Sequence, residues 1–326
     1  MSTTLPAHLS PIEVLPSELA APVAQLLEAA KRPNTLRAYR SDWRAFTSWC
    51  ERTGLAALPA QPQTVAAYIA DRQLDLAPST LQRHVASIST AHKTASYPSP
   101  CESELVRTTL QGLRATHRPT AKRTGRKGKA PALTAEQMRS IVSAVGNDPA
   151  GLRDKALLLL GYKAALRRSE LAGIDWQDIE LLPEGIVLHL RNSKTDKSLT
   201  GQRVAVVAEG GSFCAVHALE AWRRWCTHQT DTQTGAVFRS VNKHLHLGER
   251  LSTASVGAIV TGRASEIGLD GVTAHSLRRG HLTEAHRKGR SEADLMHTSR
   301  HKSVAVFRGY LDDADLFSRA TGRGLL

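Results

Sequence analysis

The stretch HSLRRGHLTEAHRKGRSEADLMHTSRHKSVAVFRGY, residues 275–310, is the part of the chain around which the rest is best understood. His275 and Arg278 stand three residues apart, a spacing that places both on one turn of a helix. His301 follows, and Tyr310 lies nine residues after it. Such side chains suit an attack on a phosphodiester, provided that an arginine and a lysine join them. Candidates for both occur upstream.

The composition of the chain indicates a polyanionic partner. A length of 326 residues suggests about two domains. The formal net charge is +13 and the pI is near 10.0, so clustered lysines and arginines gain free energy by releasing counterions from phosphates. Nucleic acid is the first candidate partner. A membrane is not expected, because no apolar run approaches the roughly 20 residues that span a bilayer.

Three features bear on the compartment and on metal binding. Residues 1–19 have neither a positively charged start nor an apolar signal core, so we expect a cytoplasmic protein. His297 and His301 stand four residues apart, but the residues between them offer no carboxylate, and we expect no metal site and no cofactor. The cysteines lack paired spacing, which predicts reduced thiols that mostly fill the core: Cys50, Cys101, Cys214 and Cys226.

The N-terminal half is predicted to be a flexible tail, residues 1–16, followed by a helical domain, residues 17–116. Periodicity predicts four or five short helices with basic faces, beginning near Ser17, Asn34, Thr64, Ser79 and Ser103. In the second helix Trp43 and Phe46 recur at helical spacing, and we interpret them as core rather than as base-stacking groups. The arginines on the other faces are candidates for phosphate contact: Arg37, Arg40, Arg44 and Arg83.

Residues 117–132 (HRPTAKRTGRKGKAPA) contain no acidic residue and almost nothing apolar, which predicts an extended linker between two domains. It is either a solubilising tether or a strap across a nucleic-acid backbone, and its charge density favours the strap. The basic residues that would make this contact are Arg118, Lys122, Arg123, Arg126, Lys127 and Lys129.

The second domain, residues 133–326, is predicted to be mainly α with a small β-hairpin or three-stranded sheet. Thr134 begins it with helix-capping chemistry, and a helix over Leu152–Lys163 is apolar nearly all round. Two β-rich runs, 186–190 and 203–207, are joined by a polar loop, and residues 174–179 are a candidate third strand. Later helices are predicted over 213–226 and 252–267 and from residue 274 onward.

Cleavage of a phosphodiester by a side chain needs a nucleophile, positive donors for the non-bridging oxygens and a proton donor for the departing oxygen. Tyr310 is the candidate nucleophile, although its ordinary pKa of about 10 requires nearby cations or a base. Arg167, near the start of a buried helix with Glu170 as a possible ion-pair partner, and Arg278 are the candidate donors.

A lysine on the hairpin loop is the candidate proton donor. Lys194 is favoured, and Lys197 on the same loop stays open as the alternative. His275 and His301 suit proton transfer or a hydrogen bond to the phosphate, because histidine titrates near neutral pH.

Taken together, these motifs resemble those of the tyrosine site-specific recombinases, or phage integrases, of the simple two-domain Cre and Xer kind. The segment ALRRSEL, residues 165–171, looks like the first family box, whose arginine is here Arg167, and HSLR, residues 275–278, looks like the HxxR box. Lys194, His301 and Tyr310 fall at the positions of the family's lysine, its His-or-Trp and its nucleophile. Two residues depart from the pattern, since Ala165 and Arg300 stand where many relatives have Gly.

This resemblance implies a SAM-like core-binding domain and a catalytic domain that clamp double-stranded DNA carrying a specific recombination site. It implies that Tyr310 forms a 3′-phosphotyrosyl link and releases a 5′-hydroxyl, without metal or ATP. It also implies a nucleoid-associated homo-oligomer, a tetramer in the synaptic complex, with a helix after Tyr310 docked on a neighbouring subunit.

Two other functions remain open at this stage. A similar set of residues serves type IB topoisomerases, which relax supercoils without exchanging strands between duplexes. An architectural DNA-binding protein would keep the fold without turnover. The residues do not indicate which DNA site is bound, or whether the role is integration, excision, dimer resolution or transposition.

Overall fold

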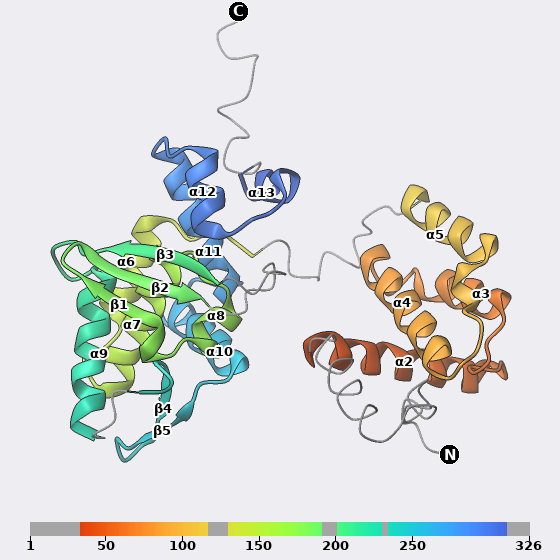
Figure 1. Cartoon of the computed structure of the whole chain (residues 1–326), viewed down its shortest axis with the longest axis horizontal. Coiled ribbons are helices and arrows are strands. Elements are labelled where there is room, and N and C mark those ends of the chain that lie inside the picture. Colours follow the sequence, from red (N-terminus) through yellow and green to blue (C-terminus); the bar gives the residue numbers. More distant parts are fainter. Residues whose placement is uncertain (1–32, 117–129, 191–200, 230–233, 312–326) are drawn as a thin grey trace, which may run out of the picture. The chain divides into compact units, whose positions relative to one another are not determined.

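The structure, a computed structural model, describes residues 33–116, 130–190, 201–229 and 234–311 (Figure 1). The chain divides into two compact units, Met1–Arg126 and Lys127–Leu326. The predicted tail, the helix near Ser17 and most of the predicted linker lie outside the described residues.

The N-terminal unit is helical, as predicted. Proline stands at the first position of α3 and α4, where the missing N–H breaks no helical hydrogen bond. The aromatic side chains of α2 pack inward, with Phe46 and Tyr68 edge to face at a centroid distance of 5.1 Å, so their interpretation as core is confirmed. The elements of this unit are α2 (Pro33–Thr53), α3 (Pro62–Arg72), α4 (Pro78–Thr94), η2 (Pro100–Glu102) and α5 (Glu104–Thr116).

The C-terminal unit is built around α7 (Pro149–Lys163), whose predicted all-round burial is confirmed. Thr134 caps α6 (Ala135–Ala144) through a reciprocal pair of hydrogen bonds with Gln137, as its capping chemistry predicts. The remaining helical elements are α8 (Arg168–Gly173), η4 (Trp176–Asp178), α9 (Ala215–Gln229), α10 (Thr253–Ser265), α11 (Ala274–Arg287), α12 (Glu292–Ser299) and α13 (Val304–Leu311).

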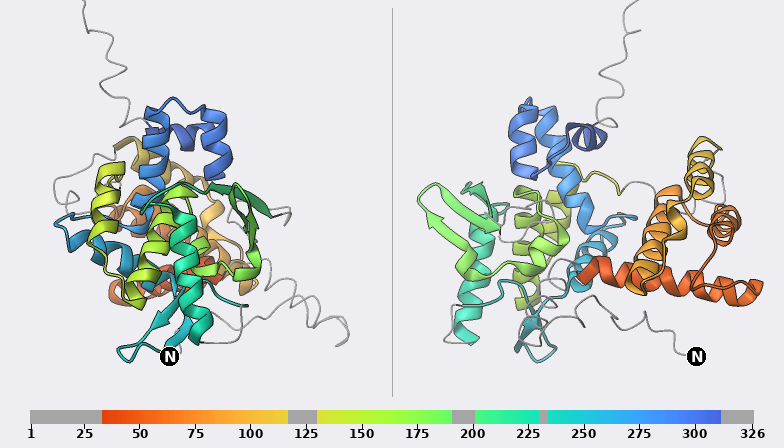
Figure 2. Two further views of the ribbon diagram at one scale, coloured as in Figure 1. Left: turned by 90° about the vertical axis from the view of Figure 1, so that its left-hand side faces the viewer. Right: turned by 45° about the vertical axis from the view of Figure 1, so that its right-hand side comes forward.

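An antiparallel three-stranded sheet stands at the edge of this helical unit in both views of Figure 2. It comprises β1 (Ile179–Leu182), β2 (Gly185–Leu190) and β3 (Gln202–Val207). The predicted hairpin is confirmed, with Ile186 opposite Val206 and Leu188 opposite Val204, and all four side chains buried. The loop between β2 and β3 that holds Lys194 and Lys197 lies outside the described residues.

Two details of the β structure differ from the sequence prediction. The third strand covers Ile179–Leu182 and not 174–179, because Asp178 accepts a hydrogen bond from the amide of Asp175 at 3.0 Å and curls the chain into η4. A second hairpin of β4 (Arg239–Val241) and β5 (Leu247–Arg250) was not predicted, since such short strands leave little room for an alternating pattern.

Helices α11, α12 and α13 carry residues 275–310, the stretch that holds His275, Arg278 and His301. Leu282, Leu295 and Phe307, one from each helix, form a small hydrophobic cluster of their own. The three helices lie together in Figure 1. This cluster fixes the segment between α12 and α13, which contains His301, against α11.

The cysteines are free thiols, and Cys50, Cys214 and Cys226 are buried. Burial raises the pKa of Cys50 to about 11 and that of Cys226 to about 12, so both stay protonated near neutral pH. This agrees with the prediction that they mostly fill the core. Within the described ranges, no helix has the length and apolar character needed to cross a membrane.

Gly280 marks the closest packing of α11. A Cβ atom there would lie 2.3 Å from the carbonyl oxygen of Leu133 and 3.0 Å from a ring carbon of Tyr162. We expect Gly280→Ala to lower the free energy of unfolding by about 1–3 kcal/mol, because backbone must shift to admit the methyl group. Gly262→Ala in α10 is the matched control, since a Cβ there has nothing within 4 Å. The control should gain up to about 1 kcal/mol from helix propensity. Urea unfolding measures both, and equal stability of Gly280→Ala and wild type would contradict the packing.

Candidate active site

Arg167 precedes α8 as its N-cap residue, in agreement with its predicted place near the start of a buried helix. Its amide donates to Oε2 of Glu170 at 2.7 Å, and its guanidinium donates to Oε1 of the same carboxylate at 2.7 Å. The ion pair with Glu170 that the three-residue spacing made possible is therefore present. The side chain of Arg167 is 20% exposed, so a part of it remains accessible to solvent.

Arg278 lies in α11 and is 1% exposed. Its Nη1 donates to the carbonyl oxygen of Ala165 at 2.6 Å, and its Nη2 donates to the carbonyl oxygen of Ser299. Nη2 also lies 3.4 Å from Nε2 of His301. One guanidinium thus joins α11 to the turn before α8 and to the end of α12.

His301 follows the end of α12 and is partly buried. Its Nδ1 lies 2.7 Å from Oγ of Ser299, and its ring packs on Phe307 of α13 with a centroid distance of 5.7 Å. Burial and then the positive charges of Arg278, Arg167 and Arg300 together lower the pKa of His301 to about 4. His301 is therefore neutral near pH 7 and suits a hydrogen bond more than a positive charge.

His275 lies in the first turn of α11 with its side chain exposed. The surrounding protein and then the charges of Arg278, Arg279 and Arg167 lower its pKa. His275 lies one helical turn before Arg278, Arg278 contacts His301, and Arg167 contacts the residue that precedes His301, so the structure gathers these four predicted residues into one neighbourhood.

The side chains of the remaining predicted site residues lie outside the described part of the structure. Tyr310 belongs to the last turn of α13, but its side chain lies outside what the structure describes. Lys194 and Lys197 are also outside the described residues. The backbone of α13 is nevertheless held close to His301 by the buried Phe307.

Arg300 is a member of the site that the sequence analysis treated only as a departure from a family pattern. Its guanidinium is buried and donates to Oε2 of Glu170 at 2.7 Å and to the carbonyl oxygen of Ala165 at 3.0 Å. No pattern in the sequence marks this role, because these partners lie 130 and 135 residues away along the chain.

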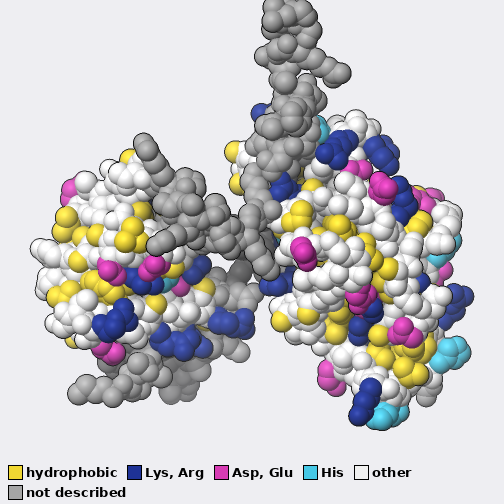
Figure 3. All heavy atoms as spheres, turned by 180° about the vertical axis from the view of Figure 1, so that it is seen from behind, with side chains coloured by type: hydrophobic (Ala, Val, Ile, Leu, Met, Phe, Trp, Pro, Cys, Tyr) yellow, Lys and Arg dark blue, Asp and Glu magenta, His cyan; other side chains and the backbone are white. Residues whose placement is uncertain are grey.

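The arginines of the N-terminal unit that are candidates for phosphate contact differ in their surroundings. Arg37, Arg40 and Arg44 of α2 are exposed, and Figure 3 shows lysine and arginine side chains gathered along the side of this unit where α2 runs. Arg83 is half exposed but holds the buried carboxylate of Asp42 through two hydrogen bonds of 2.7 and 2.9 Å. The linker candidates lie outside the described residues: Lys122, Arg123, Arg126, Lys127 and Lys129.

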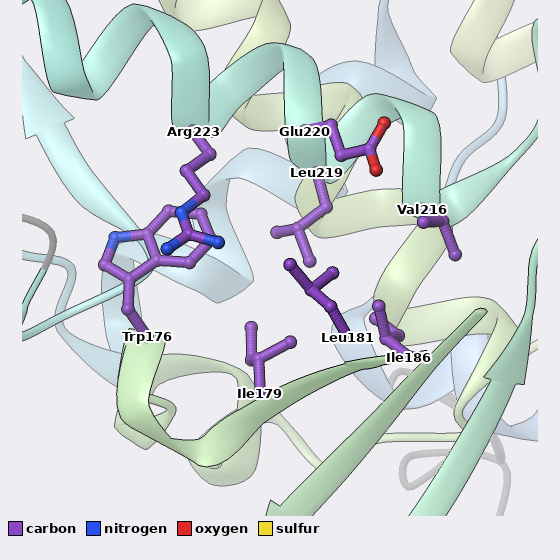
Figure 4. Close-up of a pocket in the computed structure, with 8 residues that line it drawn as sticks. All are labelled: Trp176, Ile179, Leu181, Ile186, Val216, Leu219, Glu220 and Arg223. Atoms are coloured by element: carbon purple, nitrogen blue, oxygen red, sulfur yellow. The ribbon is translucent and has the colours of Figure 1, made fainter. Parts of the chain in front are cut away.

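A small pocket between β1, β2 and α9 is separate from this group of arginines (Figure 4). The guanidinium of Arg223 covers the ring of Trp176 at 5.3 Å, and Leu181, Ile186 and Leu219 make the lining mostly apolar. Such a lining does not suit a phosphodiester, so the arginine cluster is the better candidate for the active site.

Comparison with known proteins supports one family. Residues 131–316 match the phage integrase family. The chain is 33% identical over 299 residues to an integrase/recombinase XerD homolog of Selenomonas ruminantium, covering 89% of this chain and 85% of that protein. It is 23% identical over 287 residues to recombinase Cre of Escherichia phage P1, covering 83% of this chain and 82% of that protein. A lambda integrase tetramer bound to a Holliday junction has the same fold, with a TM-score of 0.58 at 19% identity, covering 89% of this chain and 75% of that chain.

The charge of Glu170 should make the stability of the C-terminal unit depend on pH. Burial alone would raise the pKa of Glu170, but Arg300 and the amide and guanidinium of Arg167 outweigh it and lower the pKa. Its contribution is therefore complete above the ordinary value of 4.5 and is lost as pH falls through the folded pKa. We expect Glu170→Gln to lower the free energy of unfolding by about 2 kcal/mol at pH 7 and by much less at low pH.

Urea unfolding at both pH values measures this difference. Glu292→Gln is the matched control, because Glu292 pairs with Arg308 at the surface at 3.3 Å. The control should change stability by less than about 1 kcal/mol. A Glu170→Gln effect of the same size at both pH values would show that the carboxylate is not held in its charged form.

Proposed function

Because this chain belongs to the phage integrase family, the tyrosine recombinases, we propose that it is a site-specific DNA recombinase that cuts and rejoins strands through a covalent tyrosine intermediate. The two-unit chain would act on double-stranded DNA carrying its recombination site. The exposed arginines of α2 and the basic segment around residues 117–132 would bind the phosphate backbone in a manner that depends on salt.

One observation carries this proposal. Arg167 and Arg278 are 111 residues apart in sequence, yet both donate to the backbone of the same short segment. Arg167 donates to the carbonyl oxygen of Arg300 at 3.4 Å, and Arg278 donates to that of Ser299. Two guanidiniums that meet in this way can grip the non-bridging oxygens of one phosphate and stabilise the charge that grows during attack.

In the reaction the phenolic oxygen of Tyr310 attacks the scissile phosphorus. The bond from phosphorus to the 5′-oxygen breaks, a 3′-phosphotyrosyl ester forms, and the 5′-hydroxyl leaves with a proton from Lys194, or from Lys197 if that lysine reaches the site. The proton of the tyrosine passes to a neutral histidine, His275 or His301, and the surrounding cations stabilise the phenolate. The neutral His301 and His275 would donate or accept hydrogen bonds at the phosphate.

Rejoining reverses these bonds. The 5′-hydroxyl of the partner strand attacks the phosphotyrosyl ester and releases Tyr310, so the number of phosphodiester bonds is unchanged. Because the ester conserves the bond energy, the exchange requires no ATP, and because arginines neutralise the phosphate, it requires no metal ion. Exchange between two duplexes calls for four protomers, and the assembly that we propose is a homotetramer on DNA.

Covalent trapping tests the nucleophile. A DNA duplex with a nick near the cleavage site loses its short 5′-hydroxyl fragment after attack, so the ester should accumulate and migrate as a DNA-linked band under denaturing conditions. We expect the band with wild type and its loss in Tyr310→Phe. The control is Tyr97→Phe, whose exposed tyrosine lies in the N-terminal unit and should leave the band unchanged. Tight binding without a band in wild type would leave only a DNA-binding function.

Salt dependence tests the basic linker. Replacement of Lys122, Arg123, Arg126, Lys127 and Lys129 by glutamine should weaken binding and reduce the slope of log K against log salt by up to about 4. Cleavage in a single turnover at saturating DNA should be preserved. The charge-preserving control replaces the three lysines by arginine and should keep the slope of wild type. Equal slopes for the neutralised and wild-type proteins would show that the linker is a tether and not a strap.

A further inference from the structure

Arg300 occupies an unfavourable position for an arginine. It ends α12 in the left-handed conformation, with φ of 59°, where a residue other than glycine loses about 1 kcal/mol or more. Its side chain is 2% exposed, and removal of a guanidinium from water is costly. Among the described residues, its buried Nε has no hydrogen-bond partner. Glycine would end the helix without these costs, so the side chain of Arg300 needs another explanation.

The guanidinium of Arg300 donates hydrogen bonds to two regions of the chain. Nη1 donates to the carbonyl oxygens of Thr298 at 2.7 Å and Ala164 at 3.3 Å. Nη2 donates to the carbonyl oxygen of Ala165 at 3.0 Å and to Oε2 of Glu170 at 2.7 Å. Arg300 therefore fastens the end of α12 to the turn between α7 and α8.

Two of these acceptors are shared with the arginines of the site. Glu170 accepts from Arg300 and also from the amide and guanidinium of Arg167. The carbonyl oxygen of Ala165 accepts from Arg300 and also from Arg278 at 2.6 Å. Ala165 itself has a positive φ of 47°, so the turn that offers this oxygen is strained and depends on its partners.

The charges of these residues also suggest why an arginine stands at position 300. Arg167 and Arg300 both pair with the carboxylate of Glu170, and Arg278 is joined to this pair through the carbonyl oxygen of Ala165, which also accepts from Arg300. Arg300 occupies one oxygen of Glu170, which leaves that carboxylate less able to neutralise Arg167. An excess of fixed positive charge in a water-poor site favours the additional negative charge of a phosphate under attack.

We propose that Arg300 is a positioning residue of the cleavage site, which fixes Glu170 and the Ala164–Ala165 turn and thereby holds Arg167 and Arg278 in place for the phosphate. This role rests on the proposed function, because the phosphate is that of the scissile bond. It assigns to Arg300 an action through its neighbours and no contact with the DNA.

Two substitutions test the proposal. Arg300→Gly removes the side chain and relieves the left-handed conformation, so the folded state should survive. Arg300→Lys keeps a charge but loses the forked geometry that reaches several acceptors. We expect Arg300→Gly to bind duplex DNA within about twofold of wild type and to form the tyrosyl adduct about 10–100-fold more slowly in a single turnover. Arg300→Lys should fall between the two, and added propylguanidinium should partly restore the Gly variant.

A readout independent of activity is the titration of His301 by NMR of histidine-labelled protein. The charge of Arg300 contributes to the lowered pKa of His301, after burial, Arg278 and Arg167, so that pKa should rise in Arg300→Gly. Arg287→Gln is the control, because Arg287 pairs with Glu284 at the surface of α11 at 3.1 Å. It should change neither the adduct rate nor the titration.

The proposal is overturned if Arg300→Gly forms the adduct at the rate of wild type, or if its slower rate is accompanied by an unchanged titration of His301. If wild type itself forms no adduct, the proposed function fails, and the titration still decides the place of Arg300. A raised pKa then supports the arrangement, and an unchanged pKa rejects it. If Arg300→Gly does not fold, Arg300→Asn, which also removes the charge and tolerates the left-handed conformation, gives the same two readouts.

Discussion

The buried guanidinium of Arg278 is the interaction on which the C-terminal unit depends. A charged group that is 1% exposed must find hydrogen-bond partners, or its burial costs several kcal/mol. It finds them in the carbonyl oxygens of Ala165 and Ser299, which belong to two turns that are distant in sequence. Both turns therefore lie against α11 at Arg278. Because Arg278 needs these acceptors, the same contacts that hold the fold together also bring the residues of the candidate site close to one another.

The rest of the C-terminal unit holds Arg278 and the two turns in place. Helix α7 is buried almost all round, and α11 approaches Leu133 and Tyr162 so closely that Gly280 has no room for a side chain. The cluster of Leu282, Leu295 and Phe307 holds the following helices on α11. A reaction that depends on the placement of several cations around one phosphate requires such a scaffold, because small displacements of charged groups cost orders of magnitude in rate.

The sequence predicted those features that depend on local pattern or on short spacing. The helices, the β2–β3 hairpin, the cap at Thr134 and the ion pair of Arg167 with Glu170 all follow from residues a few positions apart. The role of Arg300 was missed because its partners Ala164, Ala165 and Glu170 lie more than 100 residues away and because its conformation is one that favours glycine. The short hairpin of β4 and β5 was missed because three or four residues do not establish a period.

In the proposed reaction Tyr310, Arg167 and Arg278 converge on one phosphorus. A structure of the protein on a nicked recombination site with vanadate in place of the scissile phosphate tests it most directly, since vanadate adopts the five-coordinate geometry of the attack. We expect a bond from vanadium to the phenolic oxygen of Tyr310, with nitrogens of both arginines about 3 Å from the equatorial oxygens. Vanadate bound without Tyr310, or with either arginine directed to another part of the surface, would contradict the account.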